Sequence, residues 1–224
     1  MSELYVLIAA ILALDTALLA VLVWAYHAPR FASHRIGGGP PMRVTWPHRL
    51  RTMSVTSVLS LATVLGVVAL GHDALLHAEP TAPWVIAAQA VGILVVYDFA
   101  YYFAHRAMHH PKLLRWVHGV HHRARNPSAL ESFYQHPIEL LTGLALLFAA
   151  TWVVGPVHEH AFAAMFFVYS TVNIVVHAGI ESRVRLLAPI DFLIRKHHAH
   201  HAADPRKNYS TMTPLPDWIF GTAR

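Results

Sequence analysis

The histidines are the residues whose type and spacing best fit chemistry in this sequence, and many of them fall into three short groups. The groups are His105, His109 and His110; His118, His121 and His122; and His197, His200 and His201. Spacings of three and four residues return side chains to one face of a helix, so each group presents several imidazoles together. Neutral imidazole binds iron, zinc, copper and nickel, whereas magnesium and calcium prefer oxygen ligands. If the groups converge in space, they suit a metal site with more than one ion.

Further polar residues accompany these groups in a fixed order along the chain. Helical offsets of four, seven and eleven place one polar stripe on a single face, formed by Asp98, Tyr102, His105 and His109. The motifs that follow are His136-Pro137-x-Glu139, Asn173-x-x-x-His177 and the closing Trp218-Ile219-Phe220-Gly221-Thr222.

Together, these motifs resemble those of the integral-membrane fatty acid hydroxylase and sterol desaturase superfamily. The resemblance runs from Asp98 to Thr222, a little over half of the chain. It implies a di-iron oxidase that uses O2 as co-substrate and acts on a C–H bond of a lipid. The sequence has no G-x-G-x-x-G fingerprint for a flavin or nicotinamide. The two electrons are therefore expected from a separate donor, such as a cytochrome, a ferredoxin or a flavin reductase.

Nine histidines are the candidate metal ligands, and the resemblance assigns them to two irons, with zinc as a substitute in purified protein. They are His105, His109, His118, His121, His122, His177, His197, His200 and His201. A single tetrahedral zinc takes at most four protein ligands, so nine imidazoles are too many for one ion and reasonable for two. His109 and His110 compete for one position, and the polar stripe favours His109. His177 enters through its match to the superfamily motif N-x-x-x-H-x-G.

A ligating imidazole usually donates its other N–H to a carboxylate or a carbonyl, so supporting residues are expected around the nine. The candidates are Asp98, Tyr102, His110, His136 and Asn173. Asp98 fits best as an acid two turns before His105, although pairing with Arg106 or Tyr102 would also explain it. Glu139, one turn after His136, is a weaker candidate. We expect no catalytic side chain beyond the ligands.

The composition places these residues in a membrane protein. Hydrophobic residues make up 55% of the 224 positions and charged residues only 13%, with a positive mean hydropathy. Soluble domains carry roughly 25% charged residues. The chain has no cysteine, which excludes disulfides, thiolate zinc sites, iron–sulfur clusters and cysteine nucleophiles.

Five apolar segments are long enough to cross a bilayer as helices. They are residues 4–26, 53–71, 84–104, 137–155 and 161–180. The first segment holds one acidic residue, Asp15. Asp15 could have a function, or it could simply face another helix or water, and we leave it outside the site. Residues 27–52 are expected to form a basic loop broken by Gly37-Gly38-Gly39-Pro40-Pro41. Residues 186–194 are too short to cross and are expected to form an amphipathic helix in the interface.

The charges predict the topology. All 17 Lys and Arg residues follow the first, third or fifth segment, so those connections are cytosolic under the positive-inside rule. The N-terminus then lies outside, and the three histidine groups and the C-terminus lie in the cytosol. Since the net charge of +5 is explained in this way, no nucleic-acid partner is expected.

The sequence thus predicts an all-α integral membrane protein of about five helices, with a cytosolic histidine-rich helical cap that holds a dinuclear metal site. Residues 1–83 would form an N-terminal part with two helices and the basic loop, and residues 84–224 the catalytic domain. The expected reaction is hydroxylation or desaturation of a sterol, fatty acyl or related lipid. A zinc hydrolase would need a glutamate base as in H-E-x-x-H, and a bis-histidine haem carrier would place its pairs in facing spans. A metal transporter would bind near the midplane of the bilayer.

Overall fold

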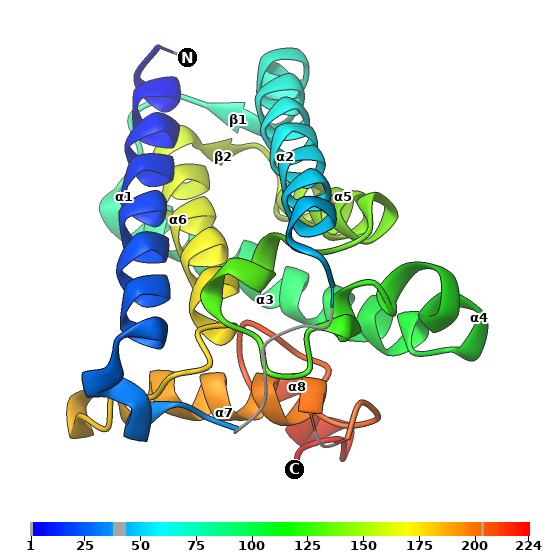
Figure 1. Cartoon of the computed structure of the whole chain (residues 1–224). Coiled ribbons are helices and arrows are strands. Elements are labelled where there is room, and N and C mark those ends of the chain that lie inside the picture. The colour runs from blue at the N-terminus through cyan, green and yellow to red at the C-terminus, as the bar shows by residue number, and fades with distance from the viewer. Residues whose placement is uncertain (1, 38–43, 203) are drawn as a thin grey trace.

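Five long antiparallel helices form the body of the protein. The structure, a computed structural model, describes residues 2–37, 44–202 and 204–224. Within them, five helices are long and apolar enough to cross a bilayer: α1 (Ser2–His27), α2 (Trp46–Leu75), α3 (Pro83–Met108), α5 (Pro137–Val154) and α6 (Glu159–Val176) (Figure 1). This confirms the predicted all-α membrane fold.

Four of the predicted span boundaries were wrong by four residues or more, including the ends of α2 (Leu75 rather than residue 71) and α3 (Met108 rather than residue 104). The helix α2 begins at Trp46, seven residues earlier than expected, because Pro47 lies in its first turn, where a missing N–H costs nothing. The helix α6 ends at Val176 rather than at residue 180, since Gly179 adopts a positive φ of 62°. Of the predicted glycine- and proline-rich break, residues 38–41 lie outside the described residues.

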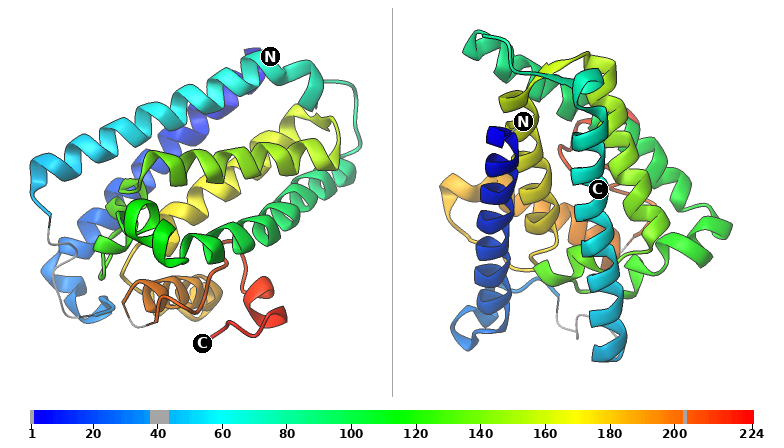
Figure 2. Two further views of the ribbon diagram at one scale, coloured as in Figure 1. Left: turned by 90° about the vertical axis from the view of Figure 1, so that its right-hand side faces the viewer. Right: turned by 90° about the horizontal axis from the view of Figure 1, so that it is seen from above.

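The helices alternate in direction, so their connections gather at two ends of the bundle. At the end that holds the N-terminus, β1 (Leu76–His77) pairs in parallel with β2 (Val157–His158). At the opposite end lie three further α-helices: α4 (Pro111–Leu113), which continues into a π-helical turn (Leu114–His118), α7 (Ala188–Ala202) and α8 (Leu215–Ile219). Four 3-10 helices lie at the same end: Pro29–His34, His121–Arg123, Ala129–Phe133 and Arg185–Leu187. Figure 2 shows α7 and the C-terminal segment lying across this end.

The helix α7 is longer than the interfacial helix predicted for residues 186–194. It continues to Ala202 and carries the third histidine group in its last two turns. Its first half exposes apolar side chains, such as Ile190 (41%) and Phe192 (37%), as expected of a helix at a membrane interface.

One apolar core joins all five long helices. Leu4 and Ile8 of α1 and Val64 of α2 lie in the same buried cluster as Ile93 of α3 and Phe162 of α6. The outward faces are apolar as well, with Leu70 of α2 93% exposed, because lipid rather than water surrounds them. The protein is an integral membrane protein, and the division at residue 84 stays a prediction.

Candidate metal centre

All nine histidines that the sequence nominated as ligands lie together at the α7 end of the bundle. They form two groups, and within each group the ligand nitrogens all lie within 4.8 Å of one another. The five-histidine group is His105, His109, His118, His122 and His200, and the four-histidine group is His121, His177, His197 and His201.

The two H-x-x-H-H motifs divide in the same way. The first and last histidines of each motif, His118 and His122 or His197 and His201, belong to the same group. The middle histidine, His121 or His200, belongs to the other group. Each motif therefore serves both groups. In α7 the neighbouring His200 and His201 point about 100° apart around the helix, whereas His118 ends a π turn and His121 begins a 3-10 turn.

In the five-histidine group, the Nε2 atoms converge on one point. His118 Nε2 lies 2.9 Å from His105 Nε2 and 3.0 Å from the Nε2 atoms of His109 and His122. His200 Nε2 lies 3.1 Å from His109 Nε2 and 3.2 Å from His122 Nε2. Two nitrogens bound at right angles to one ion at about 2.1 Å would lie ~3.0 Å apart, so the spacing matches shared coordination.

The opposite ring nitrogens set the tautomer of two of these imidazoles. His105 Nδ1 donates to the Tyr209 carbonyl (2.6 Å), and His200 Nδ1 donates to the Lys207 carbonyl (2.6 Å). A carbonyl only accepts, so the proton of each neutral imidazole is on Nδ1 and the Nε2 atom carries a lone pair. His118 Nδ1 lies 2.9 Å from the Glu139 carboxylate. Lone pairs that face one another at about 3 Å fit a cation between them.

In the four-histidine group, two of the imidazoles are fixed by carbonyls in the same way. His121 Nδ1 donates to the Tyr134 carbonyl (3.0 Å), and His177 Nδ1 donates to the Asn173 carbonyl (2.7 Å). Their Nε2 atoms lie 3.1 Å apart, and His197 Nε2 lies 2.9 Å from that of His177. His201 completes the group at 3.1 Å from His197. The residues therefore fit a second cation.

The two groups adjoin each other. The rings of His122 and His201, one from each group, are stacked with their centroids 4.7 Å apart. The ring centroids of His118 and His121 are 5.7 Å apart. The two groups could therefore hold two ions side by side.

Burial keeps these imidazoles in the neutral form that metals require. Desolvation lowers the pKa of His109 to about 4 and that of His177 to about 3, with nearby imidazoles adding to the effect. Desolvation also lowers the pKa values of His118, His197 and His201 well below the usual range. The donors are thus ready to bind a cation at neutral pH without losing protons.

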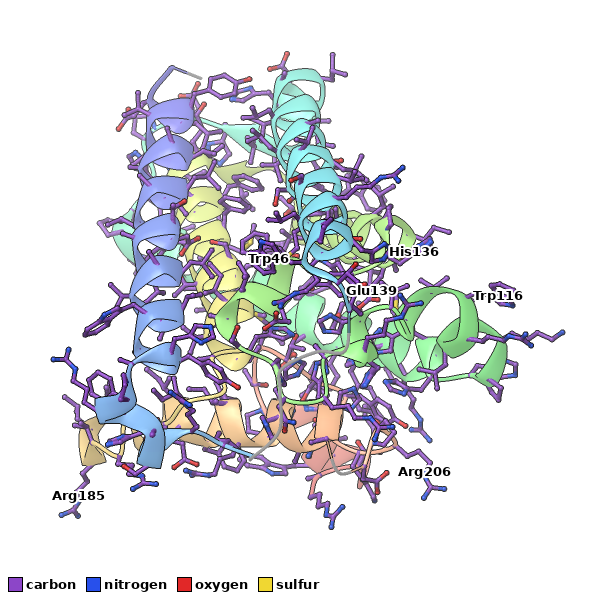
Figure 3. All side chains as sticks on the ribbon, in the orientation of Figure 1. Trp46, Trp116, His136, Glu139, Arg185 and Arg206 are labelled. Atoms are coloured by element: carbon purple, nitrogen blue, oxygen red, sulfur yellow. The ribbon has the colours of Figure 1, made fainter. Side chains whose placement is uncertain are left out.

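The chain between α3 and α5 bends tightly to bring its histidines to the centre. Pro111 begins α4, and the helix then widens into a π turn whose i+5 bond joins Gly119 N to the Leu114 carbonyl (2.7 Å). This turn ends at His118 and so places its side chain. The segment projects from the bundle, with Trp116 at its outer tip, whereas Glu139 lies near the middle of the view (Figure 3).

The supporting residues differ from those that the sequence suggested. Asp98 was expected to contact an imidazole, but its carboxylate accepts from the backbone N–H groups of Met212 (3.2 Å) and Thr213 (3.0 Å) instead. The reason is that the extended C-terminal segment needs acceptors for its buried N–H groups. The hydroxyl of Tyr102 lies 3.0 Å from that of Thr222 and helps to hold the same segment.

The other three candidates act locally or through the backbone. His110 is exposed beside His109, so of this pair the structure places His109 in the centre. His136 caps α5, where its Nδ1 accepts from Ile138 N. Asn173 contributes its carbonyl, while its side chain donates to the Tyr169 carbonyl. Sequence reasoning could not find the supporting carbonyls of residues 134, 207 and 209, since every residue type carries one.

Glu139→Gln is expected to weaken the five-histidine group. The carboxylate of Glu139 is 2% exposed and lies against His118, whereas a glutamine is neutral and supports its basicity less. Loss of such a partner lowers metal affinity by about 10- to 100-fold. Titration with iron in the presence of a competing chelator measures the change, and His136→Gln on the same helix start is the control. If both variants bound iron with the same affinity, Glu139 would have no role in supporting His118.

Gly179→Ala is expected to destabilise the region behind His177. Its φ of 62° is unfavourable for other residues, and an added Cβ would overlap the Pro127 carbonyl oxygen. We expect a loss of about 1–3 kcal/mol in unfolding free energy, seen as a lower thermal midpoint in detergent. Gly66→Ala is the control, because a Cβ there meets nothing within 4 Å. An unchanged midpoint for both variants would contradict this explanation.

A large cavity reaches the centre from the middle of the bundle. It has a volume of about 700 Å³ and is lined mainly by apolar side chains of α1, α2, α5 and α6. Its inner end includes His105, His121, His177 and His197. Two lining residues of α2, Val58 (69%) and Leu61 (44%), are strongly exposed, so the cavity opens sideways between α1 and α2 toward the surrounding lipid.

Comparison with known proteins gives one family and several relatives. The model of the family described as fatty acid hydroxylase matches residues 90–222. A methylsterol monooxygenase of Rattus norvegicus is 29% identical over 140 residues, which cover 60% of this chain and 46% of that protein. A very-long-chain aldehyde decarbonylase of Oryza sativa is 33% identical over 154 residues (64% and 55%). A methylsterol monooxygenase of Arabidopsis thaliana is 31% identical over 160 residues (64% and 58%). The chain spans about half the length of these relatives, and no solved structure matches.

Proposed function

From the premise that the chain belongs to the fatty acid hydroxylase family, we propose that it uses O2 and two external electrons to hydroxylate or desaturate a C–H bond of a membrane lipid. The observation that carries the proposal is the pair of imidazole groups whose lone pairs face one another at the inner end of an apolar cavity. A structural zinc site closes around four ligands, so the nine imidazoles exceed what a single structural ion needs.

The nine histidines would hold two iron ions, one in each group, and zinc could take their place in purified protein. Bound iron would supply the activation of O2 that no side chain can provide. The chain's own part is to fix the imidazoles through the carbonyls and Glu139, and to keep water out. The catalytic part would be residues 84–224, since all nine histidines lie there.

The cavity supports a lipid substrate with a long apolar body. Its volume is within the usual range for a ligand site, and its mouth faces the hydrocarbon region. A lipid entering between α1 and α2 would bring one carbon to His121, His177 and His197. The names of the relatives, methylsterol monooxygenase and aldehyde decarbonylase, favour a sterol or a long-chain aliphatic compound.

The electron donor would approach the α7 end. Basic side chains are concentrated there, including Arg185 and Arg206 (Figure 3), together with Lys112 and Arg115 of the projecting segment. Such a surface attracts an acidic protein, and the same charges favour a cytosolic location for this end and an N-terminus outside.

The test is reconstitution. We expect the purified protein to bind close to two iron ions per chain and, with O2 and a reductase system, to convert a sterol or long-chain lipid to an alcohol or an alkene. Mass spectrometry of products formed under ¹⁸O2 would follow the oxygen atom. Transport of metal across vesicles without lipid oxidation would favour a transporter, and ester or amide cleavage with zinc would favour a hydrolase.

A further inference from the structure

A buried acid lies far from the histidines, midway along α1. Asp15 is 6% exposed, and its Oδ1 accepts a hydrogen bond from Thr171 Oγ1 of α6 (2.8 Å). Its Oδ2 is buried and has no hydrogen-bond partner in the part of the chain that the structure describes. A polar atom withdrawn from water without a partner is unfavourable, and an acid at the centre of a membrane span is especially so. A contact with Thr171 alone therefore does not account for both oxygens.

Asp15 lines the same cavity as the histidines. Other polar side chains of this wall are already satisfied locally: Thr16 donates to the Leu12 carbonyl and Ser170 to the Phe166 carbonyl. The neighbouring Ile8, Leu12 and Val64 are apolar. Asp15 thus offers an unsatisfied oxygen beside these apolar side chains, and a few polar groups in a mainly apolar lining are how ligand sites fix the orientation of an apolar molecule.

The position of Thr171 gives the distance from this point to the metal centre. Thr171 and His177 are six residues apart at the end of α6, and a helix rises 1.5 Å per residue, so the two lie about 9 Å apart along the helix axis. The cavity continues between them past Asn173 and Ile174. One molecule of lipid size can therefore contact both ends.

We propose that Asp15, held by Thr171, forms a hydrogen bond with a hydroxyl group of the substrate, and that the carbon which reacts lies beside the four-histidine group, about 9 Å further along the axis of α6. The proposal rests on the proposed lipid oxidation. It specifies the substrate as a lipid that already carries a hydroxyl remote from the site of attack. A preceding reaction of the hydroxylating or carbonyl-reducing class must supply that group.

Binding tests the subsite without any turnover. Stearyl alcohol and octadecane would compete with a fluorescent long-chain alcohol for the purified protein. We expect the alcohol to bind about tenfold or more tightly than the alkane, since a buried polar atom left without a partner costs about 1–3 kcal/mol. Asp15→Leu should abolish the preference, whereas Asp15→Asn, which keeps an oxygen for Thr171 and gains an N–H, should retain much of it. Thr16→Val is the matched control and should leave it unchanged.

Turnover by the iron-loaded protein gives a second readout. With alcohols of increasing chain length, the oxidised carbon should stay at a constant distance from the hydroxyl, and Asp15→Leu should spread oxidation over several carbons. Equal binding of alcohol and alkane by the unaltered protein, or a preference that survives Asp15→Leu, would overturn the subsite while leaving lipid oxidation intact. If the protein bound the alcohol more tightly than the alkane but oxidised neither, the proposed lipid oxidation would be wrong and the hydroxyl-binding subsite would stand.

Discussion

His118→Ala is expected to abolish lipid oxidation and to lower the iron content from about two ions per chain to about one. His118 is the most connected ligand candidate, since its Nε2 lies within 3.0 Å of three other Nε2 atoms. Without it, His105 Nε2 loses its contact with the rest of the group, and only His109 and His122 remain joined, through His200. The four-histidine group does not contain His118 and should still bind its metal.

The measurement combines metal analysis with turnover of the reconstituted protein. His110→Ala is the matched control, because His110 belongs to the same stretch but is exposed and outside both groups. Size-exclusion chromatography in detergent would show that both variants fold. Because zinc can replace iron, metal content should be measured after loading with ferrous iron under anaerobic conditions. Unchanged activity of His118→Ala would contradict the assignment of the five-histidine group.

The nine histidines could be nominated from the sequence because helical spacing and residue type are both visible there. The division into groups of five and four was not predictable, because it depends on how three separate stretches meet. His200 of α7, for example, joins the histidines of α3 and the π turn rather than its own neighbours His197 and His201. The sequence shows which imidazoles share a helix face but not which faces oppose one another.

The supporting contacts show a second limit. Asp98 drew attention as an acid in a membrane span, yet its carboxylate holds the backbone of residues 212 and 213. Glu139 was the weaker candidate, and it lies against His118. Asp98 contacts backbone N–H groups rather than an imidazole because the C-terminal segment passes across α3. This path leaves no periodic pattern in the sequence. The span boundaries failed for a similar reason, since a proline in the first turn of α2 was read as part of the loop.

The C-terminal segment is therefore as important to the centre as the helices are. Its carbonyls at residues 207 and 209 fix the tautomers of His200 and His105. Asp217 in turn fixes this segment: it is fully buried and accepts from Tyr209 N (2.8 Å), Ser210 N (3.0 Å) and Thr222 Oγ1 (2.7 Å). It also pairs with the buried Lys196 of α7 at 2.7 Å.

Asp217→Leu is accordingly expected to destabilise the protein by about 3–5 kcal/mol, the usual cost of leaving one charge of a buried pair without its partner. The Tyr209 carbonyl would lose its fixed position, so iron affinity at the five-histidine group should fall as well. Denaturation in mixed micelles and iron titration measure the two effects. Asp204→Asn is the control, because among the described residues the Asp204 carboxylate pairs with the exposed Arg206, and such surface pairs contribute about 0–1 kcal/mol.

A double variant separates the charge effect from the positioning effect. Adding Lys196→Met to Asp217→Leu removes the unpaired cation, so much of the lost stability should return. The N–H groups of Tyr209 and Ser210 would still lack their acceptor, so the iron affinity should stay low. Recovery of both quantities together would mean that Asp217 only neutralises Lys196. Recovery of stability alone would show that the carboxylate positions the carbonyl that orients His105.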